Sequence, residues 1–448
     1  MSERFDEARI AELAASTVRA TRAEQAEAIV LASSSAYTRF AGNRIHQNVE
    51  ERDVQVSVRA VLGKRQGVAA TNRVDEDGLR EACERAVAFA RLAPEDEGFP
   101  GLPGPEPIER VERFSAATEG FGPEERARAV AGIVAQSAER GLTAAGTVQR
   151  EVRVVAVANS LGVSTSAPLT DVRATVLSMG TAGGSGWASF TGSDAAGLAP
   201  EALGAQAADL ASRSEEPGDL APGRYTVLLA PEAVSTILQF LAYTGFSAKS
   251  VEEGSSFMTG RLGERVMSET VTIADDALAP EALGATFDFE GVPKRRTPLV
   301  ERGVAVAPVT DSYWAARTGR KNTGHALPAP NAFGPYPLNL EMAPGETTED
   351  ALLASVDRGV YVTRFHYVNV EDPVKVLLTG MTRDGTFLIE GGALTRPLKN
   401  LRFTQGVIEA LGEVAGIGDV RQHVGEAGES ALVPALLLDG FEFTGQTS

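Results

Sequence analysis

The feature that most restricts the fold is a long N-terminal stretch, residues 27–72, in which apolar and polar side chains alternate. Its sequence is EAIVLASSSAYTRFAGNRIHQNVEERDVQVSVRAVLGKRQGVAATN. Such alternation is typical of strands that bury one face, and the Gly-Asn and Gly-Lys pairs within it are typical of tight turns between neighbouring strands. The stretch therefore predicts an antiparallel meander.

Helices and further strands are expected around this meander in the first half of the chain. Helical spacing of apolar residues, with Asp or Pro at the starts and Gly at one end, predicts the helices. The helices are placed at 5–20, 75–92, 123–141 and 200–214, and the strands at 150–166 and 171–179. In the second helix we expect a buried stripe formed by Leu79, Ala82, Ala86 and Phe89.

A proline-rich connector and a hinge divide the chain. Residues 93–110 contain five prolines, which are incompatible with a helix or a central strand, so we predict a connector there. Residues 215–225, EEPGDLAPGRY, are typical of an interdomain hinge. We therefore predict an N-terminal α/β domain with helices and a mixed sheet at residues 1–222, and a β-rich C-terminal domain at 223–448. The expected fold class is α+β.

The second half is predicted to be rich in strands. Candidate strands lie at 224–231, 271–277, 303–312, 374–394 and 435–443. Within 374–394, the RDGT sequence of residues 383–386 predicts a hairpin turn, because Asp-Gly pairs favour the positive φ angles of tight turns. One helix is expected here, at 231–244.

Charge and apolar patterning argue against two classes of function. The net charge of −18 repels nucleic-acid phosphates, and KRR at residues 294–296 is the one basic run. The first residues are charged and predict a helix rather than a signal peptide, and no window approaches ~18 consecutive apolar residues. With a single cysteine there is no disulfide framework. We expect a cytoplasmic protein that binds neither nucleic acid nor membrane.

Few side chains in the sequence are suited to catalysis. The histidines are scattered and form no metal-binding pair on a helix, whereas a zinc site normally needs three or four His, Cys, Asp or Glu ligands. These histidines are His46, His325, His366 and His423. Glu50 and Glu51 lie near His46, but on a strand the three side chains would point to both faces, so we favour a solvated strand.

The remaining candidates are interpreted as structural. For His325, in a loop rich in Gly and Pro, we favour hydrogen bonding at the surface, and for His366 a structural position in a sheet. Cys83 lies on the apolar side of a predicted helix and is expected to be an inert buried thiol. Asp275 and Asp276 point in opposite directions on a strand, so a shared proton is not expected.

Several long stretches resemble the TldD/PmbA family of bacterial and archaeal metallopeptidases. They are AYTRFAGNRIHQNVEERDVQVSVRA at 36–60, FMTGRLGERVMSETVTIADDA at 257–277, DFEGVPKRRTPLVERG at 288–303, APGETTEDALLASVDRGVYV at 343–362 and GMTRDGTFLIEGGALTRPLKNLRFT at 380–404. They span most of the chain in the order that the family has.

The resemblance implies a function shared between two types of subunit. TldD-type members resemble zinc peptidases, with an HExxxH motif on a helix, a cysteine in the C-terminal domain and a glutamate that activates the metal-bound water. TldE (PmbA)-type members lack the motif and pair with a TldD-type subunit. Together they act on small or unfolded peptides, including leader peptides of ribosomal natural products and an antitoxin.

The positions that match HExxxH in this sequence are Gln239, Phe240 and Thr244. Gln is a poor zinc ligand compared with imidazole, Phe has no proton to exchange, and a Thr hydroxyl is not a usual zinc ligand. The cysteine ligand is missing too, because Cys83 lies in the other half. We expect no catalytic, cofactor-binding or metal-binding residue in this chain, and zinc in a TldD-type partner.

The helix that carries these positions keeps its apolar stripe. Val234, Ile237, Leu238 and Leu241 follow the spacing of a buried helix face. The sequence therefore retains the structural element that would present the motif, and core packing is the role we expect for it.

Three hypotheses follow. The first is a TldE-type subunit, without a metal site of its own, of a heteromeric TldD/TldE zinc peptidase. The alternative is a stand-alone homodimer that binds peptides or serves as a scaffold without peptidase activity. The third is a hydrolase in which His325 or His366 forms an acid–base pair with Asp311 or Glu371.

Overall fold

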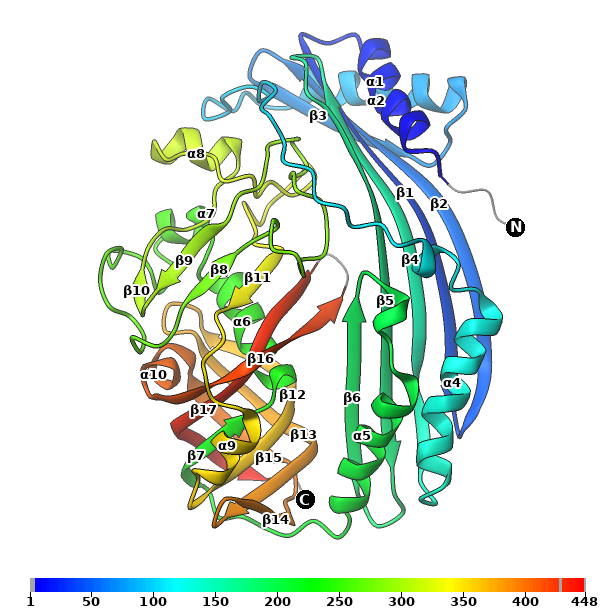
Figure 1. Cartoon of the computed structure of the whole chain (residues 1–448). Helices are drawn as coiled ribbons and strands as arrows, with labels where there is room; N and C mark the ends of the chain where they lie inside the picture. Colours follow the sequence, from blue (N-terminus) through cyan, green and yellow to red (C-terminus); the bar gives the residue numbers. More distant parts are fainter. Residues whose placement is uncertain (1–4, 427–428, 447–448) are drawn as a thin grey trace.

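The computed structural model describes residues 5–426 and 429–446, and within them the first half of the chain forms a six-stranded sheet (Figure 1). Its order is β3-β2-β1-β4-β5-β6. The strands are β1 (Gln25–Ala41), β2 (Arg44–Leu62), β3 (Arg65–Thr71), β4 (Thr143–Asn159), β5 (Ser164–Met179) and β6 (Ser185–Gly192). The predicted meander is confirmed as β1 to β3.

The N-terminal sheet is antiparallel at every pairing of its strands, so the expectation of a mixed sheet is wrong. Tight turns join most neighbouring strands. At the first turn both Gly42 and Asn43 have positive φ, as the commonest two-residue hairpins require. The one long connection, from β3 to β4, returns the chain to the free side of β1 in the antiparallel direction.

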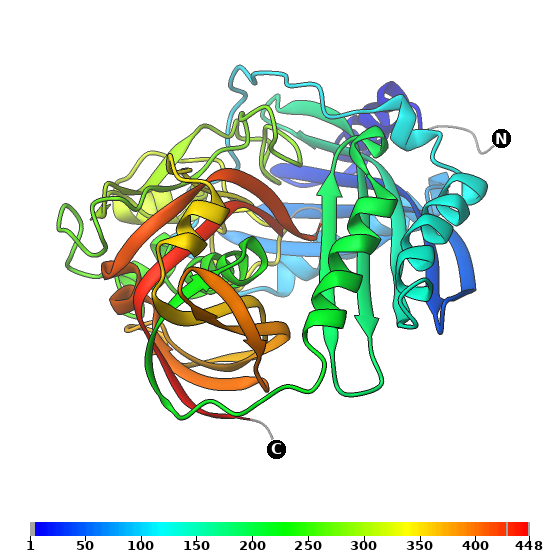
Figure 2. The same ribbon diagram turned by 60° about the horizontal axis from the view of Figure 1, so that its bottom comes forward.

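Helices cover one face of this sheet (Figure 2). They are α1 (Glu7–Ala20), α2 (Glu76–Leu92), α3 (Ala116–Glu119), α4 (Pro123–Ala138) and α5 (Pro200–Arg213). Even-numbered β1 residues such as Ala28 and Val30 are buried beneath α1 and α2, because side chains alternate between the faces of a strand. Phe89, expected in the buried stripe of α2, is instead 50% exposed.

The second half forms an eleven-stranded mixed sheet within the described residues. Its strands are β7 (Gly223–Leu229), β8 (Ile273–Asp275), β9 (Thr297–Glu301), β10 (Val304–Ala305), β11 (Asn339–Met342), β12 (Arg358–Asp372), β13 (Leu377–Glu390), β14 (Ala393–Pro397), β15 (Leu401–Gly406), β16 (Val414–Glu426) and β17 (Glu429–Gln446). Its helices are α6 (Pro231–Thr244), α7 (Ala248–Glu252), α8 (Ser312–Thr318), α9 (Glu349–Ala354) and α10 (Val407–Gly412). Because β7 pairs with both β12 and β17, part of the sheet closes into a ring.

The RDGT sequence forms a bulge and not the predicted hairpin turn. Asp384 and Gly385 have positive φ, yet β13 continues through them and pairs with β12 on both sides. The register shifts between Val362 and Arg364, opposite the bulge. The Asp384 carboxylate is held by Arg364 and by Ser185 of β6, so the bulge directs this side chain toward the N-terminal sheet.

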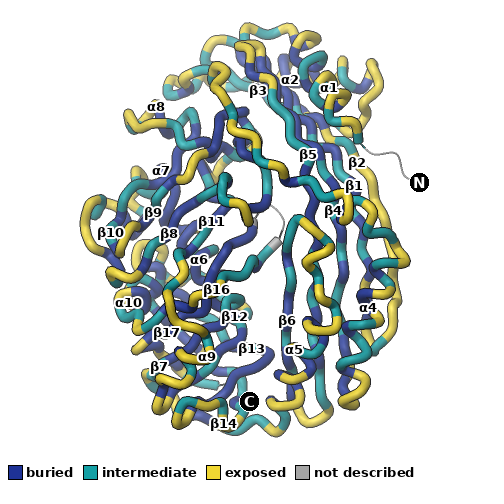
Figure 3. Tube along the Cα trace, viewed as in Figure 1, coloured by how far each residue is buried: buried dark blue, intermediate teal, exposed yellow. Residues whose placement is uncertain are grey.

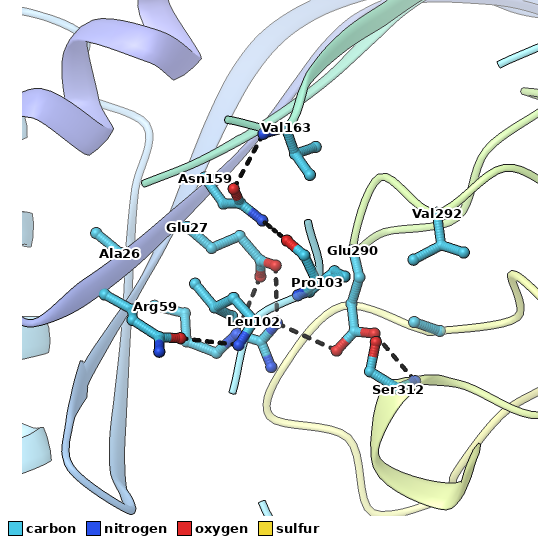
Figure 4. Close-up of polar contacts among 12 residues, drawn as sticks. Ala26, Glu27, Arg59, Leu102, Pro103, Asn159, Val163, Glu290, Val292 and Ser312 are labelled. Atoms are coloured by element: carbon cyan, nitrogen blue, oxygen red, sulfur yellow. Dashed lines mark hydrogen bonds and ion pairs between the residues drawn. The ribbon is translucent and has the colours of Figure 1, made fainter. Parts of the chain in front are cut away.

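The other face of the N-terminal sheet meets the C-terminal half. Odd-numbered residues of β1 and β4, including Ile29 and Val157, pack against Phe287. Beside them Arg59 of β2 lies between Glu27 of β1 and Glu290 of the C-terminal half (Figure 4). These three charged side chains are buried or nearly so.

A second contact joins β6 to α6 and β12. Glu232, in the first turn of α6, accepts hydrogen bonds from Ser189 and from the Trp187 indole. The Arg364 guanidinium lies 4.3 Å from the centre of the Trp187 ring. Burial raises the pKa of Glu232, and the Ser189 and Trp187 hydrogen bonds oppose the rise.

Burial is uneven across the molecule (Figure 3). The C-terminal half contains the largest apolar cluster, whereas residues 44–53 of β2 are exposed. In the described part of the chain, no helix is long and apolar enough to span a bilayer.

We expect Arg59→Ala to reduce the free energy of unfolding by about 3–5 kcal/mol, because it leaves Glu27 and Glu290 buried without their cation. Urea unfolding followed by circular dichroism measures this loss. Arg80→Ala is the matched control, since Arg80 pairs only with exposed Asp77 and Glu84 among the described residues, and its loss should stay below about 1 kcal/mol. Equal losses in the two variants would contradict the role given to Arg59.

Candidate functional site

Helix α6 follows β7 and begins with Pro231 in its first turn. Its expected stripe is confirmed, since Val234, Ile237, Leu238 and Leu241 are all buried in the C-terminal core. The helix packs against β12, β16 and β17. Its position is therefore set by apolar packing along most of its length.

The three positions that match HExxxH lie on the C-terminal turns of α6. Phe240 packs against the C-terminal core, and Gln239 is half-buried. The Thr244 hydroxyl donates a 2.7 Å hydrogen bond to the Phe240 carbonyl, so it is used within the helix. These side chains do not fit a zinc ion, which takes His, Cys and carboxylate ligands. Among residues 5–426 and 429–446, no group of three or more His, Cys, Asp or Glu side chains could hold a metal ion.

Two histidines and the cysteine lie where the sequence placed them. His46 is exposed on β2, as expected for a solvated strand. His366 lies in β12 with its ring 4.2 Å from that of Tyr367, and burial followed by the Arg383 charge lowers its pKa. Cys83 is buried on α2, 3.3 Å from the Thr21 hydroxyl. His423, to which no role was assigned, contacts the Glu281 carbonyl at 2.6 Å.

His325 is buried, at 1% exposure, so the prediction of a surface position is wrong. Its Nδ1 lies 2.9 Å from the Thr323 hydroxyl, and its Nε2 lies 3.0 Å from Asp275 Oδ1, at ion-pair distance but without hydrogen-bond geometry. Burial alone would raise the pKa of Asp275, but the charges of His325 and Lys294 hold it below its usual value. The loop that carries His325 folds back over β8, which spacing along the sequence does not indicate.

His325 lies between the Thr323 hydroxyl and the Asp275 carboxylate, as the base of a catalytic triad lies between its nucleophile and its carboxylate. The side chains of His325 and Asp275 have no exposed surface, so a substrate has no access to them. The acid–base pairs of the third hypothesis are not formed by the described residues, because no contact joins His325 to Asp311 or His366 to Glu371. A structural role explains the buried histidine better.

A cavity of about 640 Å³ lies between the two halves of the chain. Strand β3, the end of α2 and the connector border it on the N-terminal side, and α7, α8 and residues 326–334 on the C-terminal side. Its charged lining residues are Arg59, Asp96, Lys249, Glu290 and Asp311, and its aromatic ones are Phe89, Phe99, Tyr313 and Trp314. Spacing along the sequence does not indicate this cavity, because its lining residues come from segments far apart in the chain.

The carboxylates of Glu290 and Asp311 both line this cavity, and the charge of Glu290 acts on Asp311. Glu290 accepts a hydrogen bond from the Arg59 guanidinium and another, of 3.2 Å, from the Ser312 amide (Figure 4). Asp311 caps α8 by accepting from the Trp314 amide at 2.8 Å. Burial, and then the charge of Glu290, raise the pKa of Asp311 to about 6. A carboxyl group perturbed in this way and facing a cavity is a candidate for binding or catalysis.

Family models match almost the whole chain. Residues 26–90 match PmbA/TldA metallopeptidase domain 1, residues 99–215 the central domain and residues 222–445 the C-terminal domain. A metalloprotease of Methanothermobacter thermautotrophicus is 28% identical over 235 residues, which are 51% of each chain. A metalloprotease TldD homologue of Haemophilus influenzae is 30% identical over 200 residues, 41% of each chain. The chain thus spans about half the length, or less, of these curated relatives.

The fold is shared with a solved structure. TldE of Thermococcus kodakarensis superposes with a TM-score of 0.88 at 20% identity, over 97% of this chain and 99% of that one. The expected α+β fold of the TldD/PmbA type is therefore confirmed.

We expect Asp311→Asn to stabilise the protein at pH 7.5 by roughly 1–2 kcal/mol and by less at pH 4.5. The folded pKa of about 6 lies above the unfolded value of 3.8. The stability contributed by Asp311 is therefore fully present below pH 3.8 and is lost as the pH rises through 6. The amide side chain carries no charge and can still accept from Trp314. Urea unfolding at the two pH values measures the difference.

The control for this prediction is Asp53→Asn, on the exposed part of β2. Its effect on unfolding should be small and the same at both pH values. An Asp311→Asn effect that is equally independent of pH would contradict the assignment.

Proposed function

Because the chain belongs to the PmbA/TldD metallopeptidase family, we propose that it is the TldE-type subunit of a two-subunit peptidase. In this proposal a TldD-type partner supplies the zinc ion, the HExxxH helix and the glutamate base. The present chain supplies the matching half of the peptide chamber. The substrates are small or unfolded peptides, such as leader peptides or an antitoxin.

The observation that carries the proposal is the pairing of an intact family fold with Gln239, Phe240 and Thr244 at the motif positions. Phe240 belongs to the packing of the core, and the Thr244 hydroxyl is bonded within α6. A change to metal ligands here would need replacement of several side chains together. The similarity in fold to TldE of Thermococcus kodakarensis supports the same subunit type.

An unpaired sheet edge supports the handling of extended chains. Strand β3 pairs with β2 only from Val56 to Leu62. From Arg44 to Glu51, β2 pairs with β1 alone among the described strands, so no other described strand occupies its outer edge there. An extended peptide or a strand of the partner can add to such an edge by main-chain hydrogen bonds.

The test is reconstitution of activity. The chain is produced alone and together with an HExxxH-bearing chain from the same genome, and cleavage of an unstructured peptide is measured with and without a chelator. We expect activity from the pair, its loss on chelation, and none from this chain alone, because Phe240 stands where the motif has the glutamate that activates water. The matched control replaces the motif glutamate of the partner by Gln, which should abolish cleavage without separating the subunits.

Two results would contradict the proposal. One is peptidase activity of this chain alone that is lost on chelation. The other is the absence of any complex with the HExxxH chain while light scattering shows a stable homodimer, which would favour the stand-alone peptide-binding or scaffold protein.

A further inference from the structure

The cavity between the two halves has the construction of a binding site. Its volume of about 640 Å³ is within the range of small-molecule sites, roughly 300–1,000 Å³. Phe89, which lines it, is 50% exposed, so the cavity reaches the surface beside the end of α2. It also reaches α7 through Lys249, close to the end of α6.

Asp311 provides a carboxylate inside this cavity. Its side chain is only 8% exposed. One carboxylate oxygen, Oδ1, accepts from the Trp314 amide. The other, Oδ2, receives no hydrogen bond or ion pair from another residue in the described ranges. Burial disfavours the charged form of this carboxylate, and an ammonium group in the cavity would stabilise that form by donating to it.

The charges around Asp311 favour a cation over an anion. Glu290 and Asp96 also line the cavity. Of the two lining cations, Arg59 is already bound by Glu27 and Glu290, and Lys249 donates to the Ala332 carbonyl. The carboxylates of the lining therefore remain in excess, which disfavours phosphate or a peptide carboxylate.

The walls suit an apolar group next to the cation. Tyr313 and Trp314 meet edge to face with ring centres 5.6 Å apart, and Phe99 is buried beside them. Aromatic side chains bind hydrocarbon and also attract ammonium groups through their ring faces. A ligand with an ammonium group close to an apolar side chain matches both parts of the lining.

We propose that this cavity binds the ammonium group of a peptide, at its N-terminus or on a lysine, with Asp311 as the direct partner and Tyr313 and Trp314 as the apolar wall. The lining of the cavity supports the recognition of an ammonium group. That a peptide carries this ammonium group rests on the function proposed above. The site would hold one end of a peptide in the subunit that lacks zinc.

Tryptophan fluorescence reports this binding directly. The chain has two tryptophans, Trp187 and Trp314, so Trp187→Phe leaves a single reporter in the cavity wall. The probes are a short lysine-free apolar peptide with a free N-terminus, the same peptide N-acetylated, and an N-acetylated version with one lysine. The isolated chain is titrated with each peptide.

We expect the free N-terminus to change the emission of Trp314 and N-acetylation to weaken binding by about 10- to 100-fold, the range for loss of a charged hydrogen bond. Recovery by the lysine-bearing acetylated peptide would show that the site accepts an ammonium group at either position, and no recovery would restrict it to the N-terminus. Equal binding of all three peptides, or no binding of any, would overturn the proposal.

The variant test uses Asp311→Asn in the same background, with Asp53→Asn as its control. Asp311→Asn should weaken the binding of the free-amine peptide about tenfold or more, and Asp53→Asn should leave it unchanged. Unaltered affinity in Asp311→Asn would overturn the proposal. If that variant does not fold, the comparison of free and acetylated peptides on the parent chain still decides.

Failure here can be told apart from failure of the proposed subunit function. Peptide binding is measured on this chain alone, whereas the subunit function is measured as activity with an HExxxH partner. Binding without reconstitution would leave the ammonium site standing, and reconstitution without binding would remove only the site.

Discussion

The guanidinium group of Arg59, buried between Glu27 and Glu290, links the two halves of this chain. Glu27 and Arg59 belong to the N-terminal sheet, and Glu290 to the C-terminal half. Burial raises the pKa of Glu27, while the charge of Arg59 opposes the rise. Buried charges of this kind are tolerated only when their partners are in place, so the set is complete only when the halves meet. The walls of the cavity depend on the same arrangement.

In the proposed function, this chain keeps the family's fold but loses its metal chemistry at helix α6. The apolar stripe of α6 fixes the position of the helix in the core. The packing of this stripe does not depend on which side chains stand at positions 239 and 244. Gln239 and Thr244 can therefore replace metal ligands without disturbing the helix. This explains how a chain can keep a metallopeptidase fold over nearly its whole length while its motif positions take on packing and local hydrogen bonding.

Local patterns predicted local structure well. The Gly-Asn turn, the helix starts at Pro123 and Pro200 and the burial of Cys83 follow from neighbouring residues, and the structure confirms them. Contacts between distant segments were missed. His325 is buried because its loop folds over Asp275, and the Asp384–Gly385 pair bulges because Asp384 is held by Arg364 and Ser185. The cavity likewise joins segments that no spacing rule connects.

We propose that this chain lacks a zinc site of its own within a metallopeptidase fold. The most direct measurement is the zinc content of the purified chain, by elemental analysis, after saturation with zinc and removal of the free metal. We expect no stoichiometric zinc in the isolated chain, and a stoichiometric ion only when an HExxxH partner is bound. One zinc ion retained per isolated chain, and lost in Gln239→Ala, would contradict it.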